Sequence, residues 1–74
     1  QGDYQNAVMI ISGIYTEAIA YNNIGYIALL NENYDTAVDY FELSLKKSPS
    51  YYERAAENLE KAIRLRDLET KEAD

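Results

Sequence analysis

Apolar residues recur at intervals of three and four along nearly the whole chain, and a single proline, Pro49, interrupts them. Residues spaced in this way share one face of an α-helix, whereas a half-buried strand alternates with a period of two. The pattern starts at Tyr4, Ala7, Val8 and Ile11 and resumes after each polar break. The spacing therefore predicts an all-α protein.

The polar breaks divide the chain into about four predicted helices, over residues 4–12, 17–31, 34–47 and 51–71. Gly13 weakens the first helix, so we expect a connection over residues 13–16. Residues 31–33 form a polar turn of the length that joins antiparallel helices. Ser48 and Pro49 end the third helix, because proline has no N–H and disfavours a helical residue before it.

The predicted inner faces follow the apolar spacing. For the second helix they comprise Ala20, Tyr21, Ile24, Ile27, Ala28 and Leu30. For the third helix they comprise Ala37, Val38, Phe41 and Leu45. The last helix is apolar on one side and densely charged elsewhere, which is typical of a terminal helix that caps its neighbour and faces water.

The 74-residue chain contains no cysteine and no histidine. Disulfides, thiolate zinc sites, imidazole bases and Ser-His triads are therefore excluded. Thirteen acidic and seven basic side chains give a net charge of −6, which repels a phosphate backbone and argues against nucleic acid as a partner. The first 45 residues contain no lysine or arginine, so they carry the whole negative charge.

Acidic and hydroxyl side chains do not form a recognisable catalytic motif. Asp35 and Asp39 lie one helical turn apart, but a pair of this kind usually belongs to a solvated helix face. There is no Asp-x-Asp-x-Asp-Gly loop and no Gly-rich phosphate loop, and serines such as Ser44 have no histidine to activate them. We expect no catalytic residues, no metal site, no cofactor and no enzymatic activity. No apolar run approaches the ~18–20 residues of a membrane span, so we expect no membrane insertion by this chain.

A repeated frame, Tyr-x-x-Ala-Val, begins at Tyr4 and again at Tyr34. A longer pattern reads Tyr21-x-x-Ile24-Gly25-x-x-Ala28, then Ala37-x-x-x-Phe41, then Pro49. This order of an aromatic, an aliphatic-Gly pair, a small residue before an aromatic, and a closing proline resembles the tetratricopeptide repeat. Residues 18–51 form a unit of 34 residues, which is the period of that family.

The resemblance implies an antiparallel helix-hairpin solenoid of the tetratricopeptide type, of which this chain is a fragment. Residues 3–16 would be the second helix of a partial repeat, residues 17–50 one complete repeat, and residues 51–74 a C-terminal capping helix. Glu60 stands where a second glycine is expected. A glutamate there cannot accept a close-packed following helix, so we expect the array to end at this helix.

Gly25 lies in the interior of a predicted helix, where glycine costs ~1 kcal/mol relative to alanine. Close approach of a partner helix would compensate that cost. We expect such a crossing at Gly25, with Ala37 opposite it. Tyr21, Ile24 and Phe41 are expected to fill the space around the crossing.

A narrower resemblance is carried by Asn23-Ile-Gly-Tyr-Ile-Ala-Leu-Leu and by the Ser-Pro-Ser-Tyr-Tyr turn that leads into Ala-Ala-Glu-Asn-Leu. These stretches are similar to the C-terminal end of the TadD tetratricopeptide lipoproteins of tight-adherence (Flp) pilus assembly. That resemblance implies a role in assembling the pilus secretion pore at the periplasmic face of the bacterial outer membrane, through an N-terminal lipid anchor outside this chain. The residues themselves indicate no compartment.

In tetratricopeptide arrays the first helix of each hairpin lines a concave groove that receives a partner segment. The resemblance therefore implies a non-enzymatic protein–protein interaction scaffold. The candidate groove residues are Asn22, Tyr26 and Leu29 on one helix and Arg54, Glu57 and Lys61 on the last. Asn22 and Tyr26 can hydrogen-bond a peptide, and Tyr26 with Leu29 offers an apolar platform. The alternative is that Tyr26 is a half-buried aromatic and Asn22 a surface amide.

The character of the partner follows from the charge distribution. Asn23 and Asn58 resemble part of the clamp by which some of these repeats hold a terminal carboxylate, but the first 45 residues supply no base for it. The anionic half instead favours a polar or basic segment, mainly through its association rate. A different hypothesis is structural self-association, in which Val8, Ile10 and Ile11 leave apolar surface that pairs with another copy as a homo-oligomer.

Overall fold

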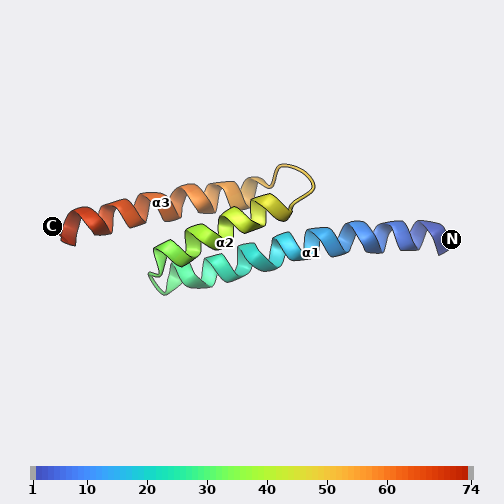
Figure 1. Cartoon of the computed structure of the whole chain (residues 1–74), viewed down its shortest axis with the longest axis horizontal. Coiled ribbons are helices and arrows are strands. Elements are labelled where there is room, and N and C mark those ends of the chain that lie inside the picture. The colour runs from blue at the N-terminus through green and yellow to red at the C-terminus, as the bar shows by residue number, and fades with distance from the viewer. Residues whose placement is uncertain (1, 74) are drawn as a thin grey trace.

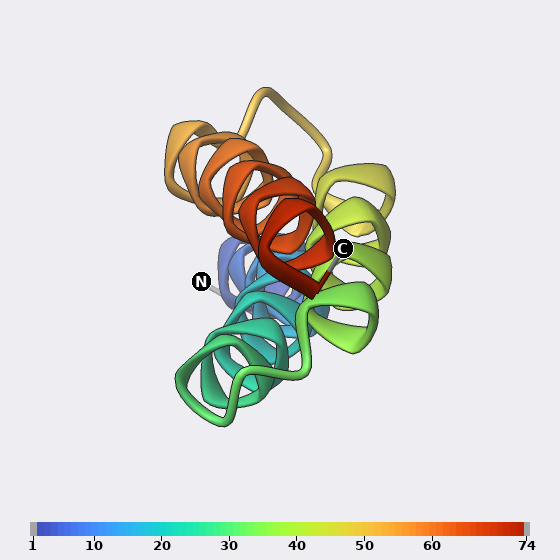
Figure 2. The same ribbon diagram turned by 90° about the vertical axis from the view of Figure 1, so that its left-hand side faces the viewer.

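Three α-helices make up residues 2–73, the part of the chain that the computed structural model describes, with side chains described from residue 16 to residue 71. They are α1 (Gly2–Leu30), α2 (Tyr34–Lys47) and α3 (Glu53–Ala73), and α2 runs antiparallel to the other two (Figure 1). Figure 2 shows the bundle end-on, with α1 and α3 both packed along α2 and much less against each other. The prediction of an all-α fold containing a helical hairpin is confirmed.

The predicted number of four helices is not confirmed, because α1 continues through residues 13–16 without a break. Gly13 costs a helix only ~1 kcal/mol, and no proline stands near it to remove a backbone hydrogen bond. The N-terminal part of α1 consequently extends beyond the connection between α2 and α3 (Figure 1). Val8, Ile10 and Ile11 lie outside the residues whose side chains are described. Within residues 2–73, no helix has the length and apolar character to cross a membrane.

The turn between α1 and α2 is closed by backbone hydrogen bonds around Glu32. The Asn33 N–H donates to the Ala28 carbonyl at 2.9 Å, and the Glu32 N–H donates to the Leu29 carbonyl at 3.0 Å. This pair of bonds is the Schellman arrangement, which places one residue in the left-handed region. That residue is Glu32, with φ of 63°, although glycine is the residue usually found there. The turn therefore carries backbone strain at Glu32.

The connection from α2 to α3 ends α2 as the sequence predicts. Ser48 has extended backbone angles, as expected for a residue before proline, and its N–H donates to the Ser44 carbonyl at 3.0 Å. The Ser48 hydroxyl donates to the Ser50 carbonyl at 2.7 Å. The first backbone bond of α3 runs from the Ala56 N–H to the Tyr52 carbonyl. These contacts reverse the chain so that α3 returns along α2.

The crossing of α1 and α2 is centred on Gly25 and Phe41, both of which are buried. A Cβ atom added to Gly25 would lie 2.7 Å from Cε1 and 2.8 Å from Cδ1 of Phe41. The predicted close approach at Gly25 is thus present, but the group opposite it is the Phe41 ring. Ala37 lies one helical turn earlier on α2 and is buried in the same core cluster.

A buried hydroxyl adds a polar link at this crossing. Ser44 has no exposed surface, and its Oγ donates to the Ala18 carbonyl of α1 at 2.5 Å. Ala18 is also fully buried, so the two backbones approach closely here. The half-buried rings of Tyr21 on α1 and Tyr40 on α2 stack with their centroids 6.0 Å apart. Small residues and one hydroxyl therefore hold α1 against α2 beside the Phe41 ring.

The predicted inner face of α1 needs correction. Ala20, Ile24, Ile27 and Leu30 are exposed, although the sequence predicts that they pack inward. The face of α1 that α2 and α3 cover includes Ala18, Gly25 and other residues on the opposite side of the helix. The apolar stripe of α1 is wider than the surface that its two neighbouring helices cover, so part of the stripe stays exposed.

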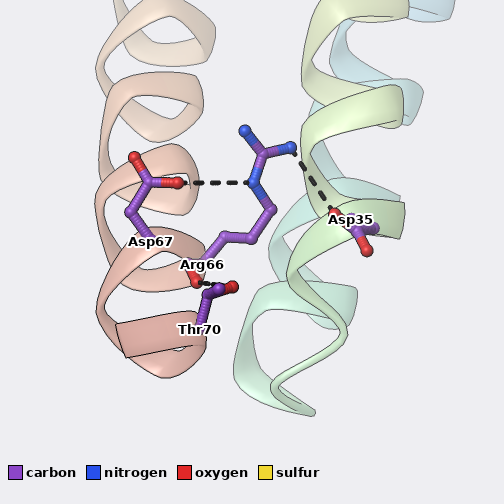
Figure 3. A network of polar contacts seen from close by, with 4 residues as sticks. All are labelled: Asp35, Arg66, Asp67 and Thr70. Atoms are coloured by element: carbon purple, nitrogen blue, oxygen red, sulfur yellow. Dashed lines mark hydrogen bonds and ion pairs between the residues drawn. The ribbon is translucent and has the colours of Figure 1, made fainter. Parts of the chain in front are cut away.

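Arg66 links the far end of α3 to the start of α2 (Figure 3). Its Nη1 donates to Asp35 Oδ1 at 3.5 Å, and its Nε lies 3.8 Å from Asp67 Oδ1. Thr70 Oγ1 donates to the Arg66 carbonyl at 3.1 Å. These contacts are largely exposed, so each contributes at most about 1 kcal/mol, and of the three only the contact with Asp35 joins α3 to α2.

Candidate partner-binding groove

The candidate groove lies where α1 and α3 approach each other across the edge of α2. Asn58 Nδ2 on α3 donates a hydrogen bond of 3.0 Å to Asn22 Oδ1 on α1. Asn22 is only 4% exposed, so this bond satisfies a carbonyl oxygen that water hardly reaches. Ala55 and Ala62 of α3 are fully buried, and their small side chains let α3 come close to its neighbours. The amide pair forms the floor between the two helices.

A hollow of about 410 Å³ opens above this amide pair. Its lining comes from α1 and α3 together and consists of Asn22, Asn23, Tyr26, Arg54, Glu57 and Asn58. Every lining residue is polar or, in the case of Tyr26, carries a hydroxyl on an aromatic ring. Such a lining offers hydrogen-bond donors and acceptors, and the ring of Tyr26 adds one flat apolar surface.

The hollow contains one charge of each sign. Arg54 and Glu57 are exposed, lie one helical turn apart on α3, and face the uncharged side chains of α1. Within residues 16–71 the ion pairs are Lys47 with Glu17 and Arg66 with two aspartates, so neither charge of the hollow is neutralised by such a pair. Both charges are therefore available to a group that enters from solvent.

Four of the six predicted groove residues line this hollow together: Asn22, Tyr26, Arg54 and Glu57. Tyr26 is exposed, whereas Asn22 is buried and contributes through its bond to Asn58. Lys61 is exposed on α3 but lies outside the lining. These placements bring the two predicted helix faces to one site.

Leu29 does not belong to the groove. It is 6% exposed and packs in the core cluster with Ala28 and Val38. The predicted apolar platform of Tyr26 and Leu29 is therefore wrong. The reason is the position of α3, because its apolar side, including Leu59, covers this cluster one turn beyond Tyr26.

Two lining residues, Asn23 and Asn58, are not among the groove residues that the sequence predicts. Asn58 follows Arg54 by four residues, so helical spacing alone places both on one face of α3. Asn23 is adjacent to Asn22 in sequence and is an exposed lining residue of the hollow. The spacing on α3 could therefore have identified Asn58, whereas Asn23 had no separate signal.

The lining of the hollow contains a single acidic side chain, Glu57. Within the described part of the chain, no group of three or more acidic, histidine or cysteine side chains is arranged to hold a metal ion. Every buried side-chain nitrogen or oxygen there has a hydrogen-bond partner. What the hollow presents is hydrogen-bonding and charged groups at the surface.

Residues 18–51 match the family model of the tetratricopeptide repeat. The matched segment contains the second half of α1, all of α2 and most of the connection to α3, which is the hairpin built around Gly25 and Phe41. This match supports a tetratricopeptide repeat protein. Repeats of this family generally mediate protein–protein interactions and are generally non-enzymatic. Neither the search of curated proteins nor the search of solved structures gave a match.

Proposed function

We propose that the groove between α1 and α3 binds a segment of a protein partner without catalysing a reaction. The observation that carries the proposal is the hollow above the Asn22–Asn58 pair, which takes its polar lining from both helices. The tetratricopeptide match over residues 18–51 adds support, because these repeats generally act as interaction modules.

The partner segment is polar or basic. Asn23 and Asn58 each carry a donor and an acceptor, which is the pairing that a peptide group offers in return. Glu57 can accept from a lysine or arginine of the partner, and Tyr26 can stack on its side chain. The negative charge of the first 45 residues attracts a basic segment from a distance and speeds its association.

The narrower resemblance to TadD lipoproteins of pilus assembly remains a prediction, since the comparison with curated proteins gave no relative of that kind. The division into a partial repeat, a complete repeat and a capping helix also remains a proposal. The family match supports its central part, residues 18–51. Binding in the groove does not depend on either of them.

A peptide-display selection against the whole chain tests the proposed function. Peptides that bind the protein should be enriched in polar and basic residues, and should lose most of their affinity for a Tyr26→Ala, Glu57→Ala double variant. Tyr51→Ala is the matched control, because Tyr51 is an exposed tyrosine outside the hollow. Peptides that bind the groove variant as tightly as the parent chain would overturn the proposal.

A second candidate function, structural self-association, is supported by a separate observation. Ile24 and Ile27 are exposed on α1, on the side that neither α2 nor α3 covers. Exposed large aliphatic residues that gather on one face of a protein commonly mark an interaction surface.

A further inference from the structure

The groove between α1 and α3 has two chemically different ends. The two helices run parallel, because both are antiparallel to α2 (Figure 1). Their side chains meet at the hydrogen bond of 3.0 Å between Asn58 and Asn22. Tyr26 follows Asn22 by one helical turn on α1, whereas Arg54 precedes Asn58 by one helical turn on α3. Tyr26 and Arg54 therefore lie on opposite sides of the amide pair along the groove.

The separation of these two ends follows from helix geometry. A rise of ~1.5 Å per residue over four residues on each helix places Tyr26 and Arg54 about 12 Å apart along the groove. Both residues line the same hollow of about 410 Å³. An extended segment advances ~3.3 Å per residue, so about four residues span this distance. Side chains four residues apart in such a segment also point to the same side, because successive side chains alternate.

Glu57 separates the two ends electrostatically. It is exposed, lines the hollow and lies between Arg54 and Asn58 in the sequence of α3. A carboxylate of the partner is attracted by Arg54 and repelled by Glu57, so it is held at the Arg54 end. A cationic side chain is repelled by Arg54 and attracted by Glu57, and the exposed ring of Tyr26 offers it a surface for stacking. The two ends therefore favour opposite charges.

We propose that the groove selects an extended segment in which a carboxylate at the Arg54 end and an arginine at the Tyr26 end are four residues apart. This inference rests on the proposed function and specifies which segments the groove accepts. Arginine suits the Tyr26 end because its planar guanidinium can stack on an aromatic ring and still donate hydrogen bonds from its edge. A basic segment that contains one acidic residue meets both requirements, and either order of the two residues along the segment places the charges correctly.

Fluorescence anisotropy with the whole chain and synthetic serine-rich peptides tests this inference. One peptide carries a glutamate and an arginine four residues apart, and a second peptide of the same composition carries them two residues apart. Both spacings keep the two side chains on one side of an extended segment, but the shorter one spans only about 7 Å. Each spacing is measured in both orders, and the tighter order is compared.

We expect the four-residue spacing to bind about tenfold more tightly, because the shorter peptide loses one charged contact. Equal affinities for the two spacings would overturn the inference, as would the absence of binding by every peptide. If binding is lost in the Tyr26→Ala, Glu57→Ala variant but does not depend on spacing, the groove function stands and only the spaced charge pair is rejected.

A charge reversal tests which end holds the carboxylate. Arg54→Glu should weaken the four-residue peptide about tenfold, and should bind more tightly a peptide in which a second arginine replaces the glutamate. Lys61→Glu is the matched control, because Lys61 is an exposed cation on α3 that lies outside the hollow. Its affinity for the four-residue peptide should change by less than about threefold. Equal effects of the two reversals would contradict the assignment of the carboxylate to Arg54.

Discussion

Asn58 donates a hydrogen bond of 3.0 Å to Asn22, and this bond joins α3 directly to α1 across the edge of α2. The two helices otherwise contact each other little, since each packs mainly on α2. The same two amides form the floor of the hollow that we propose as the binding groove. One side-chain pair thus connects the packing of α3 with the shape of the site.

Removing this bond should destabilise the protein. Asn58→Ala leaves the carbonyl oxygen of the buried Asn22 without its partner, which should cost about 1–3 kcal/mol in the free energy of unfolding. Asn23→Ala removes an exposed amide from the same hollow and should change stability by less than about 0.5 kcal/mol. Urea denaturation of both variants measures the difference. Equal stabilities would show that the amide pair contributes nothing to the position of α3.

Gly25→Ala should also destabilise the protein, although alanine is the better helix former. The new Cβ would lie 2.7 Å from the Phe41 ring, and Phe41 is fully buried, so the two helices must separate or the ring must shift. Overpacking of this kind costs about 1–3 kcal/mol, whereas helix propensity returns only ~1 kcal/mol.

A double-mutant cycle tests this cause. Against a Phe41→Leu background the cost of Gly25→Ala should fall, because the smaller side chain leaves room for a methyl group. An unchanged cost in that background, measured by thermal unfolding, would assign the effect to the helix itself and contradict the close crossing.

Glu32→Gly should stabilise the protein. Glu32 has φ of 63°, where a side chain costs about 1–2 kcal/mol and glycine costs nothing, although glycine also increases the entropy of the unfolded chain. The net gain expected is about 0.5–1 kcal/mol in the free energy of unfolding. Asn33→Gly is the matched control, since Asn33 has φ of −89° and gains no such relief. A loss of stability in Glu32→Gly would disprove the strain at this turn.

The stability of the protein at alkaline pH should depend on Tyr34. Desolvation by the surrounding packing, followed by the charges of Glu32 and Glu69, raises the pKa of Tyr34 above its ordinary value of 10.0. The folded protein therefore holds this proton more tightly than the unfolded chain does. Its contribution to stability is complete below pH 10 and is lost as the pH rises through the raised pKa. Melting temperatures between about pH 9 and 12 should fall more steeply for the parent chain than for Tyr34→Phe, and parallel curves would contradict this.

The local parts of the fold could be predicted from the sequence. The bounds of α2 agree with the prediction at both ends, because a polar turn precedes Tyr34 and Ser48-Pro49 stops the helix. The crossing at Gly25 was also predicted from the cost of glycine in a helix. The residue that lies opposite Gly25 could not be predicted, because Ala37 and Phe41 lie on the same face of α2. Only the register of the two helices decides which of them faces Gly25.

The candidate site shows the same limit. Asn22, Tyr26, Arg54 and Glu57 lie together as helical spacing and the family resemblance implied. Leu29 shares a face with Tyr26 in the helix pattern, but it becomes part of the core because α3 covers that end of the face. The lateral position of α3 depends on contacts between distant segments, and helical spacing does not contain that information.

A nuclear magnetic resonance titration with a peptide from the display selection tests the central claim most directly. If the groove between α1 and α3 binds the partner segment, the largest amide shifts should fall on the lining residues, including Asn23, Arg54 and Asn58. Shifts that instead gather on the exposed side of α2, around Asp39 and Glu42, would contradict the proposed groove.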